Sequence, residues 1–120
     1  MNNENLKQRT KQFALRVIKL VESLPQDRTS NVPGHQLLRS GTSVGANYRA
    51  ACRSKSTADF ISKMGTVEEE ADESGYWMEL LVEAEKIKPV KVSALIQEAS
   101  ELTAISISSI LTARKSQSRR

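Results

Sequence analysis

The sequence predicts an all-α fold: a single domain over residues 1–120, built as an up-down-up-down antiparallel four-helix bundle. Apolar residues recur at helical spacing in four segments, and short polar breaks separate these segments. Three prolines and five glycines are too few for a turn-rich all-β domain. Aromatic residues make up only 4% of the chain, so aliphatic and small side chains must form the core.

The first helix is expected over residues 6–24, and Pro25 and the polar residues after it end this helix. Its core face repeats apolar side chains at Leu6, Phe13, Val17, Leu20, Val21 and Leu24. Another side of the same helix is basic and carries Arg9, Arg16 and Lys19.

The second helix is expected over residues 33–53, with Pro33 in its first turn and Ser30 or Asn31 as its cap. Two glycines lie on its core face, Gly41 and Gly45. A glycine inside a helix costs about 1 kcal/mol relative to alanine, so we expect a neighbouring helix to approach closely there. The opposite face carries a basic stripe of Arg39, Arg49 and Arg53.

The third helix is expected over residues 57–86, because Ser56 followed by Asp59 matches a capping box. An acidic block, Glu68–Glu73, follows on this helix. Its second half is apolar on two sides, and a helix of that kind is usually buried on two sides. We therefore expect an oligomer interface at Tyr76, Trp77, Leu80 and Ala84.

The fourth helix is expected over residues 91–114, after a break at Lys86–Pro89, and the basic tail 115–120 is expected to be disordered.

The charge of the chain is unevenly distributed along the sequence. Residues 1–60 carry ten Lys and Arg against four Asp and Glu, net +6, whereas residues 61–113 carry four against ten, net −6. This division favours an anionic partner for the basic half or docking between opposite charges.

No catalytic, metal or cofactor motif is present, so no enzyme activity, metal or cofactor is expected. The single histidine, His35, has no ligand at metal-binding spacing, and no E-x-x-H motif of di-iron bundles occurs. Cys52 is the one cysteine and lies on an apolar face, which fits a reducing cytoplasm. No apolar run is long enough for a signal peptide or a membrane span.

Three ordered motifs carry a resemblance to a known family: RSGTSVGANYRAACRSKSTADF, EEEADESGYWMELL and EASELTAI. They resemble small bacterial four-helix-bundle proteins called 23S ribosomal RNA intervening-sequence proteins, over residues 13–114. The resemblance implies a homopentamer of up-down bundles with no firmly assigned activity. Accessory proteins of diversity-generating retroelements share this fold, which implies contact with nucleic acid and with a protein partner such as a reverse transcriptase.

Together these observations predict a non-enzymatic, oligomeric accessory protein whose basic surface binds RNA or DNA without strong sequence specificity. The expected phosphate contacts are Arg39, Arg49, Arg53, Arg9, Arg16 and Lys19. The alternative is a structural or protein-interaction module that uses the charge division for subunit docking or for a protein partner. The sequence leaves open whether the basic stripe binds phosphates or pairs with the acidic block of a neighbouring subunit.

Overall fold

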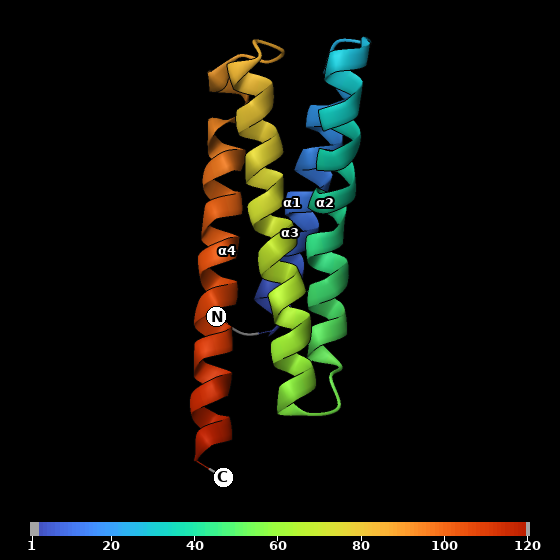
Figure 1. Ribbon diagram of the computed structural model, residues 1–120. Helices are drawn as coiled ribbons and strands as arrows, with labels where there is room; N and C mark the ends of the chain where they lie inside the picture. Colours follow the sequence, from blue (N-terminus) through green and yellow to red (C-terminus); the bar gives the residue numbers. More distant parts are fainter. Residues whose placement is uncertain (1–2, 120) are drawn as a thin grey trace.

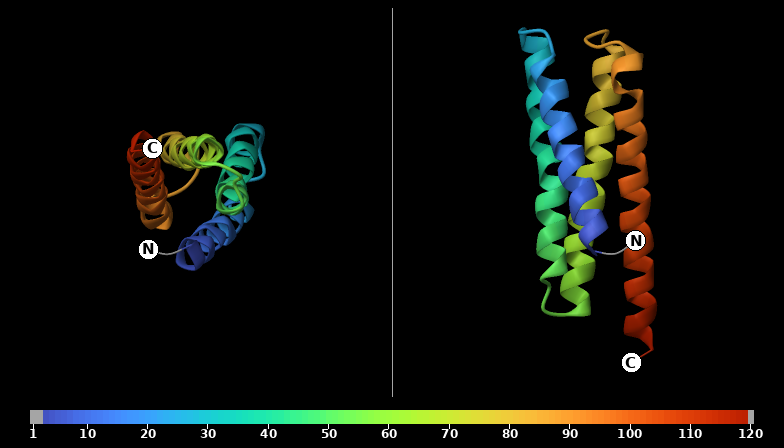
Figure 2. Two further views of the ribbon diagram at one scale, coloured as in Figure 1. Left: turned by 90° about the horizontal axis from the view of Figure 1, so that it is seen from below. Right: turned by 180° about the vertical axis from the view of Figure 1, so that it is seen from behind.

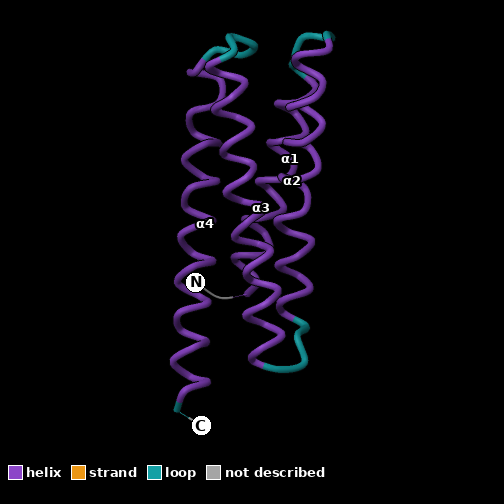
Figure 3. The backbone as a smooth tube through the Cα atoms, viewed as in Figure 1, coloured by secondary structure: helices purple, strands orange, loops and turns teal. Residues whose placement is uncertain are grey.

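The computed structural model describes residues 3–119 and contains four α-helices and no strand in that range. These are α1 (Asn3–Glu22), α2 (Arg28–Cys52), α3 (Thr57–Glu83) and α4 (Pro89–Ser118) (Figure 1). The α1–α2 and α3–α4 connections lie at one end of the molecule, and the α2–α3 connection lies at the other (Figure 3). The predicted antiparallel four-helix architecture is therefore confirmed.

Each helix packs along the next one in the sequence, whereas α1 and α4 have the fewest contacts of the four neighbouring pairs. Figure 2 shows the four helices from one end, in the order α1, α2, α3, α4 around the bundle. The bundle measures 53 × 22 × 20 Å along its principal axes. The seam between α1 and α4 is thus the loosest of its four sides.

Aliphatic side chains, methionines and one phenylalanine fill the core, as the composition predicts. Its largest fully buried side chains are Phe13, Leu37, Met64, Met78, Leu81 and Leu102. Helix α1 approaches α2 closely at the two glycines, as expected. A Cβ atom on Gly41 would lie 2.8 Å from both methyl groups of Val17, and one on Gly45 would lie 3.4 Å from the backbone carbonyl carbon of Thr10. Close packing of α1 on α2 therefore depends most on Gly41, because the nearest contact at Gly45, 3.2 Å to the hydroxyl of Thr10, needs only a small shift.

Helix α2 begins five residues earlier than predicted, at Arg28 and not at Pro33. Asp27 is the cap, and its side chain accepts a hydrogen bond of 2.8 Å from the backbone N–H of Ser30. Pro33 is buried inside the second turn. The prediction was wrong because it gave proline its usual place in the first turn and so overlooked the stronger cap that precedes it.

Helix α3 begins where it was predicted to begin, and Ser56 accepts the backbone N–H of Asp59 at 3.0 Å. It ends three residues early, because the chain turns at Glu85 with φ of 60°. The N–H of Lys86 then bonds the carbonyl of Leu81 and the N–H of Glu85 bonds that of Val82, each at 2.9 Å. This pair of bonds is a Schellman motif, which satisfies carbonyls left free at the helix end.

Helix α4 begins with Pro89 in its first turn and continues to Ser118, so the prediction of a disordered tail from residue 115 was wrong for residues 115–118. The segment Lys115–Ser118 contains no glycine or proline that would stop a helix. Its lysine also complements the negative end of the helix dipole, and the hydroxyl of Ser118 donates to the carbonyl of Lys115 at 3.0 Å. Arg120 lies outside the described residues.

The start of α3 makes stability depend on pH. The Asp59 carboxylate accepts bonds from the Lys63 ammonium at 2.9 Å and from the Lys55 backbone N–H at 3.1 Å, and the two together lower its pKa. A carboxyl whose pKa falls on folding stabilises the protein above its unfolded pKa of about 3.9, and this contribution disappears as the pH falls through the lower folded value. We expect Asp59→Asn to melt below the wild type at pH 7. Melting curves recorded down to acid pH should show the two proteins converging; a constant gap would contradict this role.

Candidate functional site

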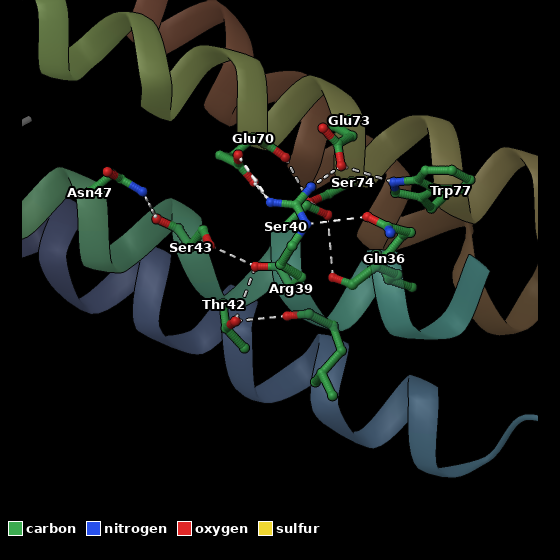
Figure 4. Close-up of polar contacts among 12 residues, drawn as sticks. Gln36, Arg39, Ser40, Thr42, Ser43, Asn47, Glu70, Glu73, Ser74 and Trp77 are labelled. Carbon is green, nitrogen blue, oxygen red and sulfur yellow. Dashed lines mark hydrogen bonds and ion pairs between the residues drawn. The ribbon is translucent and has the colours of Figure 1, made fainter. Parts of the chain in front are cut away.

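Arg39, the first member of the basic stripe, forms an ion-pair network between α2 and α3 (Figure 4). Its guanidinium bonds Glu70 at 3.0 Å, pairs with Glu73, and donates to Gln36 at 3.2 Å. The indole N–H of Trp77 donates to the same Glu73 carboxylate at 3.1 Å. Glu70 and Glu73 of the acidic block therefore pair with Arg39 of the same chain, which leaves Arg39 less available to a phosphate.

Two buried serines lie beneath this network. The hydroxyl of Ser74 is 3.0 Å from that of Ser40, and both serines have no exposed surface (Figure 4). Each hydroxyl also reaches a carbonyl of its own helix, that of Leu37 for Ser40 and that of Glu70 for Ser74. These side chains are small and satisfied, and they let α2 and α3 approach closely. Burial keeps Ser40 from any nucleophilic role.

Arg9 connects α1 to α4. Its Nε and Nη2 atoms bond the two oxygens of Glu98 at 2.7 Å each, and Nη2 also bonds Glu101 at 2.7 Å. The hydrogen bond with Glu98 is the main cause of a raised pKa for Arg9. In turn, the hydrogen bond from Arg9 lowers the pKa of Glu101. Arg9 is therefore occupied within the chain, at the seam where the two helices otherwise touch least.

Arg49 and Arg53 have no ion pair with a residue of the described range 3–119. Arg49 lies in a shallow groove of about 210 Å³ between α1 and α2, together with Lys7 and Lys11. Arg53 caps the C-terminal end of α2 and is exposed. These two arginines remain free to meet an anion, although they lie apart from the residues of the α1–α4 side.

Arg16 and Lys19 line a depression between α1 and α4, which we call the α1–α4 trough. Its smaller lobe, about 300 Å³, is lined by Arg16, Lys19, Leu20, Ser23, Lys91, Ala94 and Leu95. Its larger lobe, about 730 Å³, is lined by Ser23, Val82, Glu85, Lys86, Ile87, Lys88, Pro89 and Lys91. Ser23 and Lys91 border both lobes, so the two lobes adjoin each other.

The trough gathers positive charge from three parts of the chain. Lys86 lies 3.6 Å from Asp27, and Glu85 is the one acidic side chain among the lining residues. No carboxylate of residues 3–119 forms an ion pair with Arg16, Lys19, Lys88 or Lys91. Sequence reasoning missed Lys88 and Lys91. The antiparallel topology could have found them, because it places the start of α4 beside the end of α1.

The predicted interface residues divide by exposure. Tyr76 and Leu80 are 55% and 39% exposed, and Ala84 is exposed at the C-cap of α3. Trp77 is half-buried, packs against the core and meets Tyr76 edge to face, with ring centroids 5.0 Å apart. Helix α4 adds exposed Ile107 and Leu111. The apolar surface of α3 is therefore carried mainly by Tyr76 and Leu80.

Two kinds of site find no support within residues 3–119. No group of three or more histidine, cysteine, aspartate or glutamate side chains could hold a metal ion there. None of the helices in that range is long and apolar enough to cross a membrane.

Comparison with known proteins agrees with this architecture. The family model named 23S rRNA-intervening sequence protein matches residues 2–108. The chain belongs to this family. A solved structure from the S23 ribosomal protein family of Bacteroides thetaiotaomicron VPI-5482, described as a protein with unknown function, is 38% identical to this chain. The match covers 87% of this chain and 96% of that one, with a TM-score of 0.81.

A search of curated proteins found no match to this member of the 23S rRNA-intervening sequence protein family. Neither the family nor its solved relative indicates a catalytic activity. The comparisons therefore establish the fold and the family of the chain. Evidence about its function has to come from its surface residues.

Proposed function

We propose that this protein is a non-enzymatic accessory protein of the cytoplasm that binds RNA or DNA through the α1–α4 trough. One observation carries the proposal: Arg16, Lys19 and Lys91 converge on a single concave surface without carboxylate partners among the described residues. Guanidinium and ammonium groups bind phosphate oxygens, and such contacts carry no sequence information by themselves. Binding is therefore expected to be salt-sensitive and largely independent of sequence.

The other basic residues contribute unequally. Arg9 and Arg39 form ion pairs with glutamates of their own chain, so they hold helices together and contribute little to phosphate binding. Arg49 and Arg53 are unpaired within the described residues and extend the positive surface beyond the trough.

Reversing the three central charges tests the proposal. We expect the triple variant Arg16→Glu, Lys19→Glu, Lys91→Glu to bind a short RNA at least about tenfold more weakly at low salt. The slope of log affinity against log salt should also fall by about 3, one unit for each lost phosphate contact. Both quantities can be measured by titration of a fluorescently labelled RNA.

A matched control separates the trough from net charge. The variant Lys55→Glu, Arg114→Glu, Lys115→Glu changes the charge equally, but its three residues are exposed at the opposite end of the bundle. It should retain most of the affinity, since it leaves the trough intact. Equal loss of binding in the two variants would show that only overall charge matters, and the proposed site would then be wrong.

An interaction module is the second candidate, and exposed apolar residues on α3 and α4 favour it. Tyr76, Leu80, Ile107 and Leu111 are each at least 39% exposed, and Tyr76 and Ile107 line one groove between α3 and α4. A contiguous exposed apolar patch is typical of a surface that another chain covers. We propose that this surface is the contact between copies of the chain in a homo-oligomer, a pentamer as the family resemblance implies. The same surface could instead receive a protein partner such as a reverse transcriptase. Nucleic-acid binding and assembly use different faces and are compatible.

A further inference from the structure

The larger lobe of the trough has the size of a small-molecule site. Its volume of about 730 Å³ lies within the range of about 300–1,000 Å³ that encloses small organic ligands in other proteins. It is formed by the α3–α4 connection on one side and the end of α1 on the other. A nucleic-acid duplex is a stiff rod, so it would contact the edges of such a depression and not its interior.

The trough is lined by apolar side chains, which we call its floor, and by five cationic side chains and one carboxylate, that of Glu85, which we call its rim. Val82, Ile87 and Pro89 line the larger lobe, and Leu20 and Leu95 line the smaller one. Val82 and Ile87 also pack against the core, so the floor is held in place by the bundle. Lys88 and Lys91 border this floor, and Arg16 and Lys19 continue the positive charge along it.

Resting on the nucleic-acid function proposed above, we propose that the trough prefers single-stranded nucleic acid: one unpaired base lies on the apolar floor while the flanking phosphates meet the cationic rim. No aromatic side chain lines the trough, so the contact is apolar packing of a base on aliphatic side chains and not base–aromatic stacking. Every base has a flat face that can make this contact without sequence preference. A base inside a duplex is paired and stacked, and bringing it into the lobe requires it to be flipped out at a cost in free energy. A duplex therefore reaches the rim but not the floor.

Charge alone predicts the opposite preference. A duplex has the higher phosphate density, and its binding releases more counterions for each contact than single-strand binding does. A purely electrostatic surface should thus bind a duplex at least as tightly as a single strand. Preference for the single strand is therefore diagnostic of contact with the floor.

The first experiment uses the wild-type protein. Fluorescence anisotropy at low salt compares one labelled strand, the same strand annealed to its complement, and a strand of equal length whose central nucleotides lack bases. We expect the single strand to bind about fivefold more tightly than the duplex, and the abasic strand to lose that advantage. Equal or tighter binding of the duplex would overturn the preference while leaving the proposed phosphate contacts standing.

The second experiment fills the trough without changing its charge. Ser23 is exposed, borders both lobes and bonds only the carbonyl of its own helix end, Leu20, at 2.7 Å. We expect Ser23→Leu, whose side chain has no aromatic ring on which a base could stack, to reduce single-strand affinity about fivefold and to leave duplex affinity unchanged. Ser93→Leu is the matched control, because Ser93 is exposed on α4 and lines neither lobe.

The two proposals fail in different ways. If Ser23→Leu leaves single-strand affinity unchanged while the triple reversal abolishes binding, the floor has no role and this inference is wrong. If the triple reversal has no effect on any strand, the proposed function itself is wrong. Circular dichroism of the leucine variants checks that each remains a helical bundle.

Discussion

Replacing Gly41 with alanine is expected to lower the free energy of unfolding by about 2 kcal/mol, although alanine is the better helix former. The new Cβ atom would lie 2.8 Å from both methyl groups of Val17, closer than real side chains pack. Val17 has no exposed surface and a stiff β-branched side chain, so it cannot turn away. Relief therefore requires α1 and α2 to separate. Chemical denaturation of the two proteins measures the difference.

The matched control for this substitution is Gly65→Ala. A Cβ atom on Gly65 would meet no atom within 4 Å, and the residue lies in the interior of α3. Alanine should therefore stabilise the protein there by about 1 kcal/mol, through helix propensity alone. The two identical chemical changes are thus expected to have opposite signs. Destabilisation at both positions would show that space at Val17 is not the cause.

A double-mutant cycle isolates the contact itself. Val17→Ala removes the two methyl groups that the new Cβ atom would meet, so Gly41→Ala should cost much less in that background. The coupling between the two changes is expected to be about 1–2 kcal/mol and favourable. Additive effects would indicate that Gly41 is needed for some other reason.

Helical periodicity was enough to predict the fold, because each amphipathic segment has one apolar face and short connections leave few ways to bury four of them. The helix ends were less predictable. Pro33 has a strong preference for a first turn, yet Asp27 supplies the cap that starts α2 earlier. Lys115–Ser118 lacks any apolar residue that would signal a helix, yet nothing in it breaks the helix that precedes it.

The ion pairs between helices could not be predicted from the sequence, because they depend on the register in which two helices pack side by side. Ser40 contacts Ser74, so in this antiparallel pair Arg39 lies near residue 75 and reaches Glu70 and Glu73. By the same register, Arg49 and Arg53 lie near residues 65 and 61 of α3. The nearest carboxylates along α3 are Glu68 and Asp59, and Asp59 already bonds Lys63 and the backbone N–H of Lys55. A uniform basic stripe in the sequence is thus divided into one neutralised and two free arginines.

The α1–α4 trough shows a similar limit of sequence reasoning. Arg16 and Lys19 are recognisable as basic residues of the first helix, but Lys91 is 72 positions beyond Lys19 in the chain. Only the loose α1–α4 seam leaves a depression between them, and the depth of that depression depends on how far the two helices diverge. The charge could be predicted from the sequence, whereas its concave arrangement required the three-dimensional structure.

The proposed oligomer should dissociate when charge is placed on the apolar surface of α3. The double variant Tyr76→Glu, Leu80→Glu is expected to reduce the assembly from about 67 kDa, five chains of 13.3 kDa, to a single chain. Both side chains are exposed in the single chain, so the change should leave its folding intact. Burying two carboxylates without partners in an interface costs several kcal/mol, on the order of the binding energy that such contacts supply. Light scattering coupled to a sizing column measures the mass.

Leu15→Glu, Val32→Glu is the control for this experiment, because those side chains are 49% and 60% exposed and lie on α1 and α2. It adds the same charge and should leave the mass unchanged. Trp77→Ala is the weaker probe of the interface, since Trp77 also packs against the core and bonds Glu73, so its loss would disturb the single chain as well. If the assembly formed by the variant Tyr76→Glu, Leu80→Glu had the same mass as the wild-type assembly, the contact between chains would lie elsewhere. The exposed apolar residues of α4, Ile107 and Leu111, would then be the next to change.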